Sequence, residues 1–144
     1  MIISTKGRYA IRVLVDLAQH QNGKFIPLKE IADRQEISEK YLESVLKVLV
    51  KEKFLTGLRG KGGGYMLSKD PSSITAWDVI RLTENNGLAA VSCLGTEAIP
   101  CPREATCTTL PMWRDFEDTV KDFFTNYTIA DLAKNGVEAS DYII

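Results

Sequence analysis

A glycine-rich segment, residues 60–64, separates two short runs of strand-forming residues at 55–59 and 65–68. Two such runs joined by glycines predict a β-hairpin with a flexible tip, because glycine adopts the positive φ angles of tight turns at little steric cost. Pro71 ends the hairpin. What precedes and follows this hairpin then decides the fold class.

Three segments before the hairpin have apolar residues at helical spacing. The first covers roughly residues 6–19 with Thr5 as its cap, the second opens at Pro27, and the third runs from its cap Ser38 to about residue 53. We expect the third segment to bury one stripe: Tyr41, Leu42, Val45, Leu46 and Leu49. A tight turn joins the last two helices, so the segments form a helix-turn-helix, and a hairpin directly after it is a wing.

Beyond the wing, Thr75 or Ser73 caps a predicted helix over about residues 76–84. Residues 87–109 have no periodicity, and a long amphipathic helix with an aromatic stripe begins near Leu110. We expect a last helix over residues 128–135, closed by Gly136. The predicted fold class is mostly α (α+β): a winged helix-turn-helix head over residues 1–75, a connecting helix and cysteine loop over 76–109, and a dimerisation helix with a C-terminal helix over 110–144.

Charge is divided unevenly along the chain. Residues 1–75 carry thirteen Lys and Arg against eight Asp and Glu, whereas residues 76–144 carry five against eleven. A basic half is the electrostatic signature of a part that docks on phosphates. The chain has no apolar run of membrane-spanning length and no signal-peptide pattern, so we expect a cytoplasmic protein without a membrane partner.

An enzyme is not indicated. His20 is the only histidine, which leaves little for acid–base chemistry, and no nucleophile–base set is visible. The wing sequence GKGGGY also lacks the strand-then-helix context of a nucleotide-binding loop.

The three cysteines, Cys93, Cys101 and Cys107, all lie in the unpatterned segment. An odd, clustered set argues against a disulfide framework and for metal, cluster or redox chemistry. A zinc site with one further ligand, a thiol redox switch and buried structural cysteines remain alternatives. Glu97 and Glu104 lie in the same segment and are able to coordinate iron; solvated loop carboxylates are the simpler interpretation of each.

The predicted recognition helix and wing supply the residues for DNA contacts. Side chains of the N-terminal half of such a helix reach base edges in the major groove, and an arginine on a thin wing suits a narrow minor groove. The candidates are Ser38, Lys40, Tyr41, Glu43, Ser44, Lys47, Arg59 and Lys61. Glu43 is either a selector that accepts a hydrogen bond from cytosine or a surface residue paired with Lys47. The alternative for the wing is a solvated hairpin.

The chain resembles the IscR-type iron–sulfur regulators and their relatives NsrR and CymR. The segments that carry the resemblance are STKGRYA, ISEKYLE, RGKGGGYMLS, ITAWDVIRLTE and CLGTEAIPCPREATCTTLPMWRDF. They cover most of the chain in the right order. Wing, recognition helix and cysteine loop are independent features, so the resemblance is specific.

The resemblance implies a homodimer with two winged-helix heads on a palindromic operator of double-stranded DNA, controlling genes of the cluster-biogenesis type. It implies that Arg59 enters the minor groove and that Glu43 selects among operator classes. The long helix would dimerise through Trp113, Phe116, Val120, Phe123 and Phe124.

The resemblance further implies that Cys93, Cys101 and Cys107 are thiolate ligands of an iron–sulfur cluster, [2Fe–2S] rather than [4Fe–4S]. One departure concerns the fourth ligand: the position of the IscR-type histidine is Leu110, and the position of an NsrR-type aspartate is Arg8. The fourth ligand is therefore open. The alternative is a CymR-like regulator without a cluster, or one that uses the loop as a zinc or thiol switch.

Overall fold

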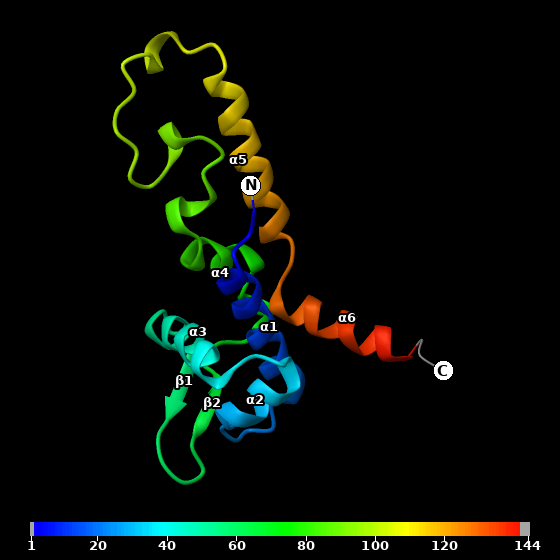
Figure 1. Ribbon diagram of the computed structural model, residues 1–144. Helices are drawn as coiled ribbons and strands as arrows, with labels where there is room; N and C mark the ends of the chain where they lie inside the picture. The colour runs from blue at the N-terminus through cyan, green and yellow to red at the C-terminus, as the bar shows by residue number, and fades with distance from the viewer. Residues whose placement is uncertain (1, 142–144) are drawn as a thin grey trace.

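The computed structural model describes residues 2–141 and confirms the mostly helical winged-helix class (Figure 1). Helices α1 (Thr5–His20), α2 (Leu28–Gln35) and α3 (Glu39–Lys51) precede an antiparallel hairpin of β1 (Leu55–Leu58) and β2 (Gly64–Leu67). After it come α4 (Ala76–Thr83), α5 (Leu110–Thr125) and α6 (Ile129–Asp141). The wing register pairs Leu55 with Leu67 and Leu58 with Gly64.

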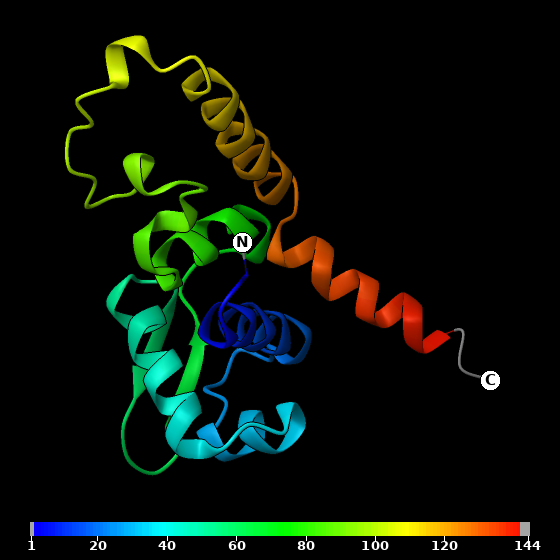
Figure 2. The same cartoon turned by 45° about the horizontal axis from the view of Figure 1, so that its top comes forward.

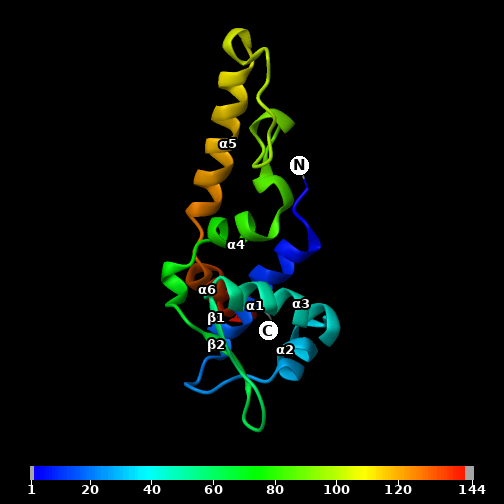
Figure 3. The ribbon, with the colours of Figure 1, turned by 90° about the vertical axis from the view of Figure 1, so that its left-hand side faces the viewer.

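The molecule is elongated, with its two ends formed by different parts of the chain. The hairpin projects from one end of the head, while the segment of residues 87–109 extends from α4 to the other end, from which α5 returns toward the head (Figures 1 and 3). Helix α6 leaves the bottom of α5 and extends sideways from the head (Figure 2). The wing tip and the cysteine segment therefore lie far apart.

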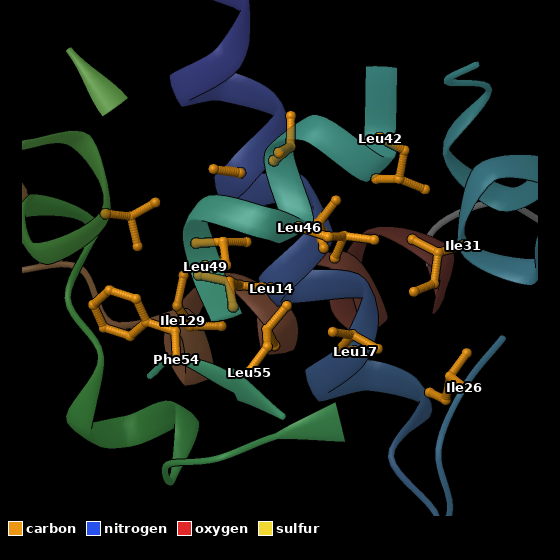
Figure 4. Packing of buried hydrophobic residues seen from close by; sticks show 14 of the residues in the cluster. Leu14, Leu17, Ile26, Ile31, Leu42, Leu46, Leu49, Phe54, Leu55 and Ile129 are labelled. Atoms are coloured by element: carbon orange, nitrogen blue, oxygen red, sulfur yellow. The ribbon is translucent and has the colours of Figure 1, made fainter. Parts of the chain in front are cut away.

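One hydrophobic core holds the head together (Figure 4). Helix α1 contributes Ala10, Val13, Leu14 and Leu17, none of them more than 1% exposed. The stripe of α3 packs against it, and Ile129 at the start of α6 is fully buried in the same cluster. The C-terminal helix thus shares the core of the head, and α1 packs against α2, α3, α4 and α6.

The start of α1 corrects a predicted cap. The Ser4 hydroxyl accepts a hydrogen bond from the Gly7 N–H at 3.0 Å, so Ser4 and not Thr5 is the N-cap. Ser4 is favoured because its own N–H and hydroxyl are held by Glu84, a contact 80 positions away in sequence. By contrast, the Ser38 and Thr75 caps are confirmed, and Thr75 forms a reciprocal capping box with Asp78.

The predicted buried stripe of α3 is right for four residues and wrong for Tyr41. Leu42, Val45, Leu46 and Leu49 are buried, whereas Tyr41 is 37% exposed. Its ring packs edge-on against Tyr9 at a centroid distance of 5.6 Å. A tyrosine at the margin of an apolar face buries its ring and leaves its hydroxyl in water, which periodicity alone does not distinguish from full burial.

The predicted end of the last helix is also wrong, because α6 continues through Gly136 to Asp141. A glycine inside a helix costs only about 1 kcal/mol relative to alanine and does not have to end it. The start of α6 is well fixed: the Thr128 hydroxyl accepts from Asp131 N–H at 3.0 Å, and the Asp131 carboxylate accepts from Thr128 N–H at 3.1 Å.

A buried carboxylate joins α1 to α2. Asp16 is 1% exposed and accepts hydrogen bonds from Arg34 Nη2 at 2.8 Å, from Arg34 Nε at 3.0 Å and from Gln35 Nε2 at 2.8 Å. The hydrogen bond to Asp16 raises the pKa of Arg34. Because a buried charge without partners is costly, these contacts determine how the helix-turn-helix sits on α1.

We expect Asp16→Asn to lower the free energy of unfolding by about 2–3 kcal/mol, since it removes a charge-assisted buried network. Urea denaturation followed by circular dichroism measures this loss. The matched control is Asp33→Asn, which removes an exposed ion pair with Lys29 and should cost less than about 0.5 kcal/mol. Equal losses in the two variants would contradict the role of Asp16.

Candidate nucleic-acid interface and cysteine loop

The predicted DNA-contact residues of α3 and of its N-cap are all exposed. Burial of its apolar stripe in the core fixes the rotation of the helix. These six residues are Ser38, Lys40, Tyr41, Glu43, Ser44 and Lys47. The Ser44 hydroxyl donates to the Tyr41 carbonyl at 2.6 Å. The ion pairs of the described residues do not include one between Glu43 and Lys47, so the simpler interpretation of Glu43 finds no contact to support it.

The wing and the recognition helix border one concave surface. A groove of about 560 Å³ is lined by Glu43 and Lys47 from α3 and by Leu58, Arg59 and Tyr65 from the wing, among other residues. Arg59 and Lys61 are both exposed at the tip of the hairpin. The structure therefore brings the predicted Glu43, Lys47 and Arg59 to the same groove, whereas Lys61 is not among its lining residues.

The wing is held to the head by its backbone. Ile26 N–H donates to the Tyr65 carbonyl, and Tyr65 N–H donates to the Ile26 carbonyl, both at 2.8 Å. Gly64, at φ +147°, makes this approach possible, because a Cβ there would overlap the Ile26 carbonyl oxygen. The glycine pattern in the sequence indicates only a hairpin turn, and it does not reveal that Gly64 also lets the wing backbone approach Ile26.

The predicted dimerisation residues form an incompletely covered stripe along α5. Phe116 is 42% exposed and Phe123 is 56% exposed, while Trp113, Val120 and Phe124 are half-buried. Phe123 packs edge-on against Phe124 with ring centroids 5.2 Å apart. Met112 in the first turn of α5 and Tyr127 just after its end add to the exposed apolar surface. So long a stripe is unusual on a monomer.

The cysteine segment contains only short 3₁₀ turns: η2 (Asn85–Leu88), η3 (Ser92–Leu94) and η4 (Glu104–Thr106). All three thiols are free; Cys93 and Cys101 are exposed and Cys107 is half-buried. The three cysteines line a single cavity of about 240 Å³ together with Glu104, Leu110 and several apolar residues. Three thiols around one cavity match the donor chemistry that iron–sulfur clusters need.

The donors do not converge in this conformation. Within the part of the chain that the structure describes, no three His, Cys, Asp or Glu side chains lie close enough together to hold a metal ion. A ligand set from this loop therefore requires the loop to close around its cavity.

Cys107 differs from the other two thiols in being half-buried and close to a hydroxyl group. Its sulfur lies 3.5 Å from the Thr109 hydroxyl. The hydrogen bond with Thr109, helped by the charge of Arg103, lowers the pKa of the Cys107 thiol below its ordinary value. A lowered pKa favours the thiolate, which is the form that binds metals.

The candidate fourth ligands lie in different places. Leu110 is 7% exposed and forms part of the cavity wall, so an apolar side chain occupies the position where the resemblance implies a histidine. Glu104 lines the same cavity, whereas Glu97 is exposed and is not among its lining residues.

His20 lies on α1, where its Nδ1 is 2.8 Å from the Asp16 carbonyl oxygen. Arg8 is exposed on α1 and donates to the Thr5 hydroxyl at 3.2 Å.

One contact between segments far apart in the sequence was not predicted. Glu84, directly after α4 and before the cysteine segment, accepts from Ser4 N–H at 3.1 Å and from the Ser4 hydroxyl at 2.6 Å. Gly7 is buried beside it, and a Cβ there would overlap the Glu84 carboxylate. The contact joins the beginning of the loop to the beginning of α1, and no local sequence pattern predicts it.

Comparison with known proteins decides the family. The profile of Rrf2, described as an iron-dependent transcriptional regulator, matches residues 3–135. The chain belongs to the Rrf2 family. Among its relatives, the HTH-type transcriptional regulator IscR of Yersinia enterocolitica is 37% identical over 135 residues, which are 94% of this chain and 80% of that protein.

Two solved structures of this group are similar to the chain throughout. The IscR of T. potens has a TM-score of 0.74 and 32% identity, and the match covers 96% of this chain and 90% of that one. CymR (YrzC), the global cysteine regulator of B. subtilis, has a TM-score of 0.72 and 33% identity, with 94% and 98% covered.

Membership in Rrf2 confirms three predictions: the resemblance to IscR and CymR, the winged-helix class and the assignment as a DNA-binding transcription regulator rather than an enzyme. Over the described residues no helix has both the length and the apolar character needed to cross a membrane.

We expect Gly64→Ala to displace the wing and to weaken DNA binding by on the order of tenfold or more, because the added Cβ meets the Ile26 backbone and not a movable side chain. The control is Gly62→Ala, which also has a positive φ, +76°, but meets no atom within 4 Å. A gel shift on an operator fragment compares the two variants. Equal affinities would mean that the Ile26 contact does not position the wing.

Proposed function

We propose that this Rrf2 protein is an IscR-like transcription regulator whose choice of operator depends on an iron–sulfur cluster held by Cys93, Cys101 and Cys107. The observation that carries the proposal is that all three thiols line one cavity. The target genes would be of the cluster-biogenesis type, and as a regulator of operator DNA the protein would act in the cytoplasm.

The DNA surface in this proposal is the groove between α3 and the wing. Lys40 and Lys47 neutralise phosphates, and Ser38, Tyr41 and Ser44 supply hydroxyls and a ring at the same face. Arg59 enters the minor groove, where a narrow groove concentrates negative potential. Glu43 acts by selection, because a carboxylate near DNA is tolerated only where a base edge donates to it.

The homodimer in this proposal forms through α5. Its stripe of Trp113, Phe116, Val120, Phe123 and Phe124 is partly exposed, and burying it against a second copy removes it from water. Two-fold symmetry then sets two heads on a palindromic operator with half-sites about 34 Å, one helical turn, or a multiple of it apart. The proposed units are residues 1–75 for DNA, 76–109 for the cluster and 110–144 for dimerisation.

Closure of the cysteine loop would reach the recognition helix through α4 and α1. Glu84 holds Ser4, and α1 packs directly on α3. Movement of residues 87–109 therefore acts on Glu84, then on the start of α1, and then on the orientation of Glu43 in the major groove. The cluster, when bound, supplies a set of iron–thiolate bonds that holds the loop closed; [2Fe–2S] is favoured by the likeness to IscR.

A second candidate is a CymR-like regulator without a cluster, or one that uses the loop as a zinc or thiol switch. The similarity to CymR over 94% of this chain favours it, as does the separation of the thiols in this conformation.

Anaerobic reconstitution with iron and sulfide tests the proposal. The wild-type protein should gain visible absorbance, and Cys101→Ser should gain almost none, because two thiolates from one loop do not retain a cluster. The variant should still fold and bind DNA, since its head is unchanged, but with altered site preference. Zinc in the purified protein, together with no uptake of iron and sulfide, would instead support the second candidate.

We expect Arg59→Ala to weaken operator binding by about 1–3 kcal/mol while stability is unchanged, because the side chain is exposed and contributes nothing to the core. Lys61→Ala is the comparison: it should weaken binding to all sequences and reduce the salt dependence by roughly one unit. Fluorescence anisotropy on specific and random duplexes at several salt concentrations measures both effects. Unchanged affinity of Arg59→Ala at moderate salt would contradict the minor-groove role.

A further inference from the structure

We infer that Glu104 is the fourth protein ligand of the cluster, and that Arg114 orients its carboxylate. This inference rests on the proposed function and names the donor that the three cysteines leave open.

The backbone links Glu104 to two of the cysteines. Glu104 N–H donates to the Cys101 carbonyl at 3.1 Å, and Cys107 N–H donates to the Glu104 carbonyl at 3.3 Å. Both are i to i+3 hydrogen bonds, and the second closes the 3₁₀ turn η4. In such turns the side chains of residues i and i+3 lie on the same side. The spacing C-x-x-E-x-x-C therefore places Glu104 one hydrogen-bonded turn from each of Cys101 and Cys107, so that closure of this short stretch is able to bring the three donors together.

Among the candidate fourth ligands, the lining of the cavity favours Glu104. Its lining contains the three cysteines and Glu104, but not Glu97. Leu110, at the position of the IscR-type histidine, has no donor atom and forms part of the wall. His20 is on α1 with its Nδ1 against the Asp16 carbonyl. Glu104 is thus the oxygen donor that already shares a cavity with the thiols.

The ion pair of Glu104 with Arg114 engages only one of its two carboxylate oxygens. Arg114, one turn into α5 from Leu110, donates from Nη2 to Glu104 Oε1 at 3.2 Å, and both side chains are more than half exposed. A carboxylate has two oxygens, so a contact to Oε1 leaves Oε2 for iron. Ligating carboxylates are commonly hydrogen-bonded in this way, which fixes their orientation. Because the pair is exposed, it can follow the loop when the loop closes.

The test is Glu104→Gln, which preserves the size of the side chain and removes its charge, with Glu97→Gln as the matched control in the same loop. Both proteins are reconstituted anaerobically with iron and sulfide. Iron and sulfide content, the electron paramagnetic resonance spectrum after reduction, and the rate of iron release to a chelator are then measured. We expect Glu104→Gln to release iron at least about tenfold faster than wild type, with a changed resonance spectrum. Glu97→Gln should match wild type in both.

Two further variants make the result decisive. Glu104→Cys places a fourth thiolate at the same position, so it should slow iron release again and shift the spectrum toward that of an all-thiolate cluster. Arg114→Ala should alter the spectrum and accelerate release less than Glu104→Gln does. Circular dichroism and DNA binding of the apo proteins verify that each variant folds; should Glu104→Gln not fold, Glu104→Cys carries the comparison.

The outcomes separate the two levels of the proposal. If the wild type takes up iron and sulfide, and Glu104→Gln and Glu104→Cys both match it in release rate and spectrum, Glu104 is not a ligand and the proposed function stands. If the wild type takes up neither iron nor sulfide, the cluster is wrong and the assignment of Glu104 with it.

Discussion

Burial of α1 is the constraint on which the rest of the structure depends. Its apolar stripe is at most 1% exposed because other elements cover it: α2 and α3 from the DNA-binding part, α4 from the connection, and α6 from the C-terminus. Each fully buried aliphatic side chain contributes about 1.5–3 kcal/mol, so no covering element can leave without a large loss of stability. The same helix carries the buried Asp16, which determines how α2 sits on it.

This central position of α1 matters because the two candidate functional surfaces lie at opposite ends of the molecule (Figures 1 and 3). The recognition helix packs on one part of α1, and the Glu84 carboxylate holds its first turn from the side of the cysteine segment. A rigid helix between two sites can pass on a change at one of them only if that change moves its end. The Ser4–Glu84 contact lies at that end, which is why it is the natural point of coupling in the proposed mechanism.

Local features of this chain were predictable from its sequence, and contacts between distant segments were not. The Ser38 and Thr75 caps, the helical periods and the hairpin depend on neighbours within a few residues, so they follow from local chemistry. The Thr5 cap failed because Ser4 is chosen by Glu84, 80 positions away. The Asp16 network escaped for the same reason, since an isolated Asp in an amphipathic helix gives no signal of its partners on α2.

The candidate site likewise has features that follow from local sequence and features that do not. The sequence shows that the three cysteines share one segment. It does not show that Glu104, at the start of η4, lines their cavity whereas Glu97 does not, because this depends on the three-dimensional course of the loop. This cavity is lined both by thiols and a carboxylate and by apolar side chains, and in the proposed mechanism that combination affects how firmly the loop would hold iron. In the proposed mechanism, closing the loop would immobilise backbone at a cost of about 1–2 kcal/mol per residue, and this cost would lower the net affinity for iron. Apolar wall residues such as Leu110 contribute no ligand, and a carboxylate binds iron less firmly than a fourth thiolate would. In the proposed mechanism the occupancy of the loop therefore follows the supply of iron and sulfide, which is the property a regulator of cluster formation needs.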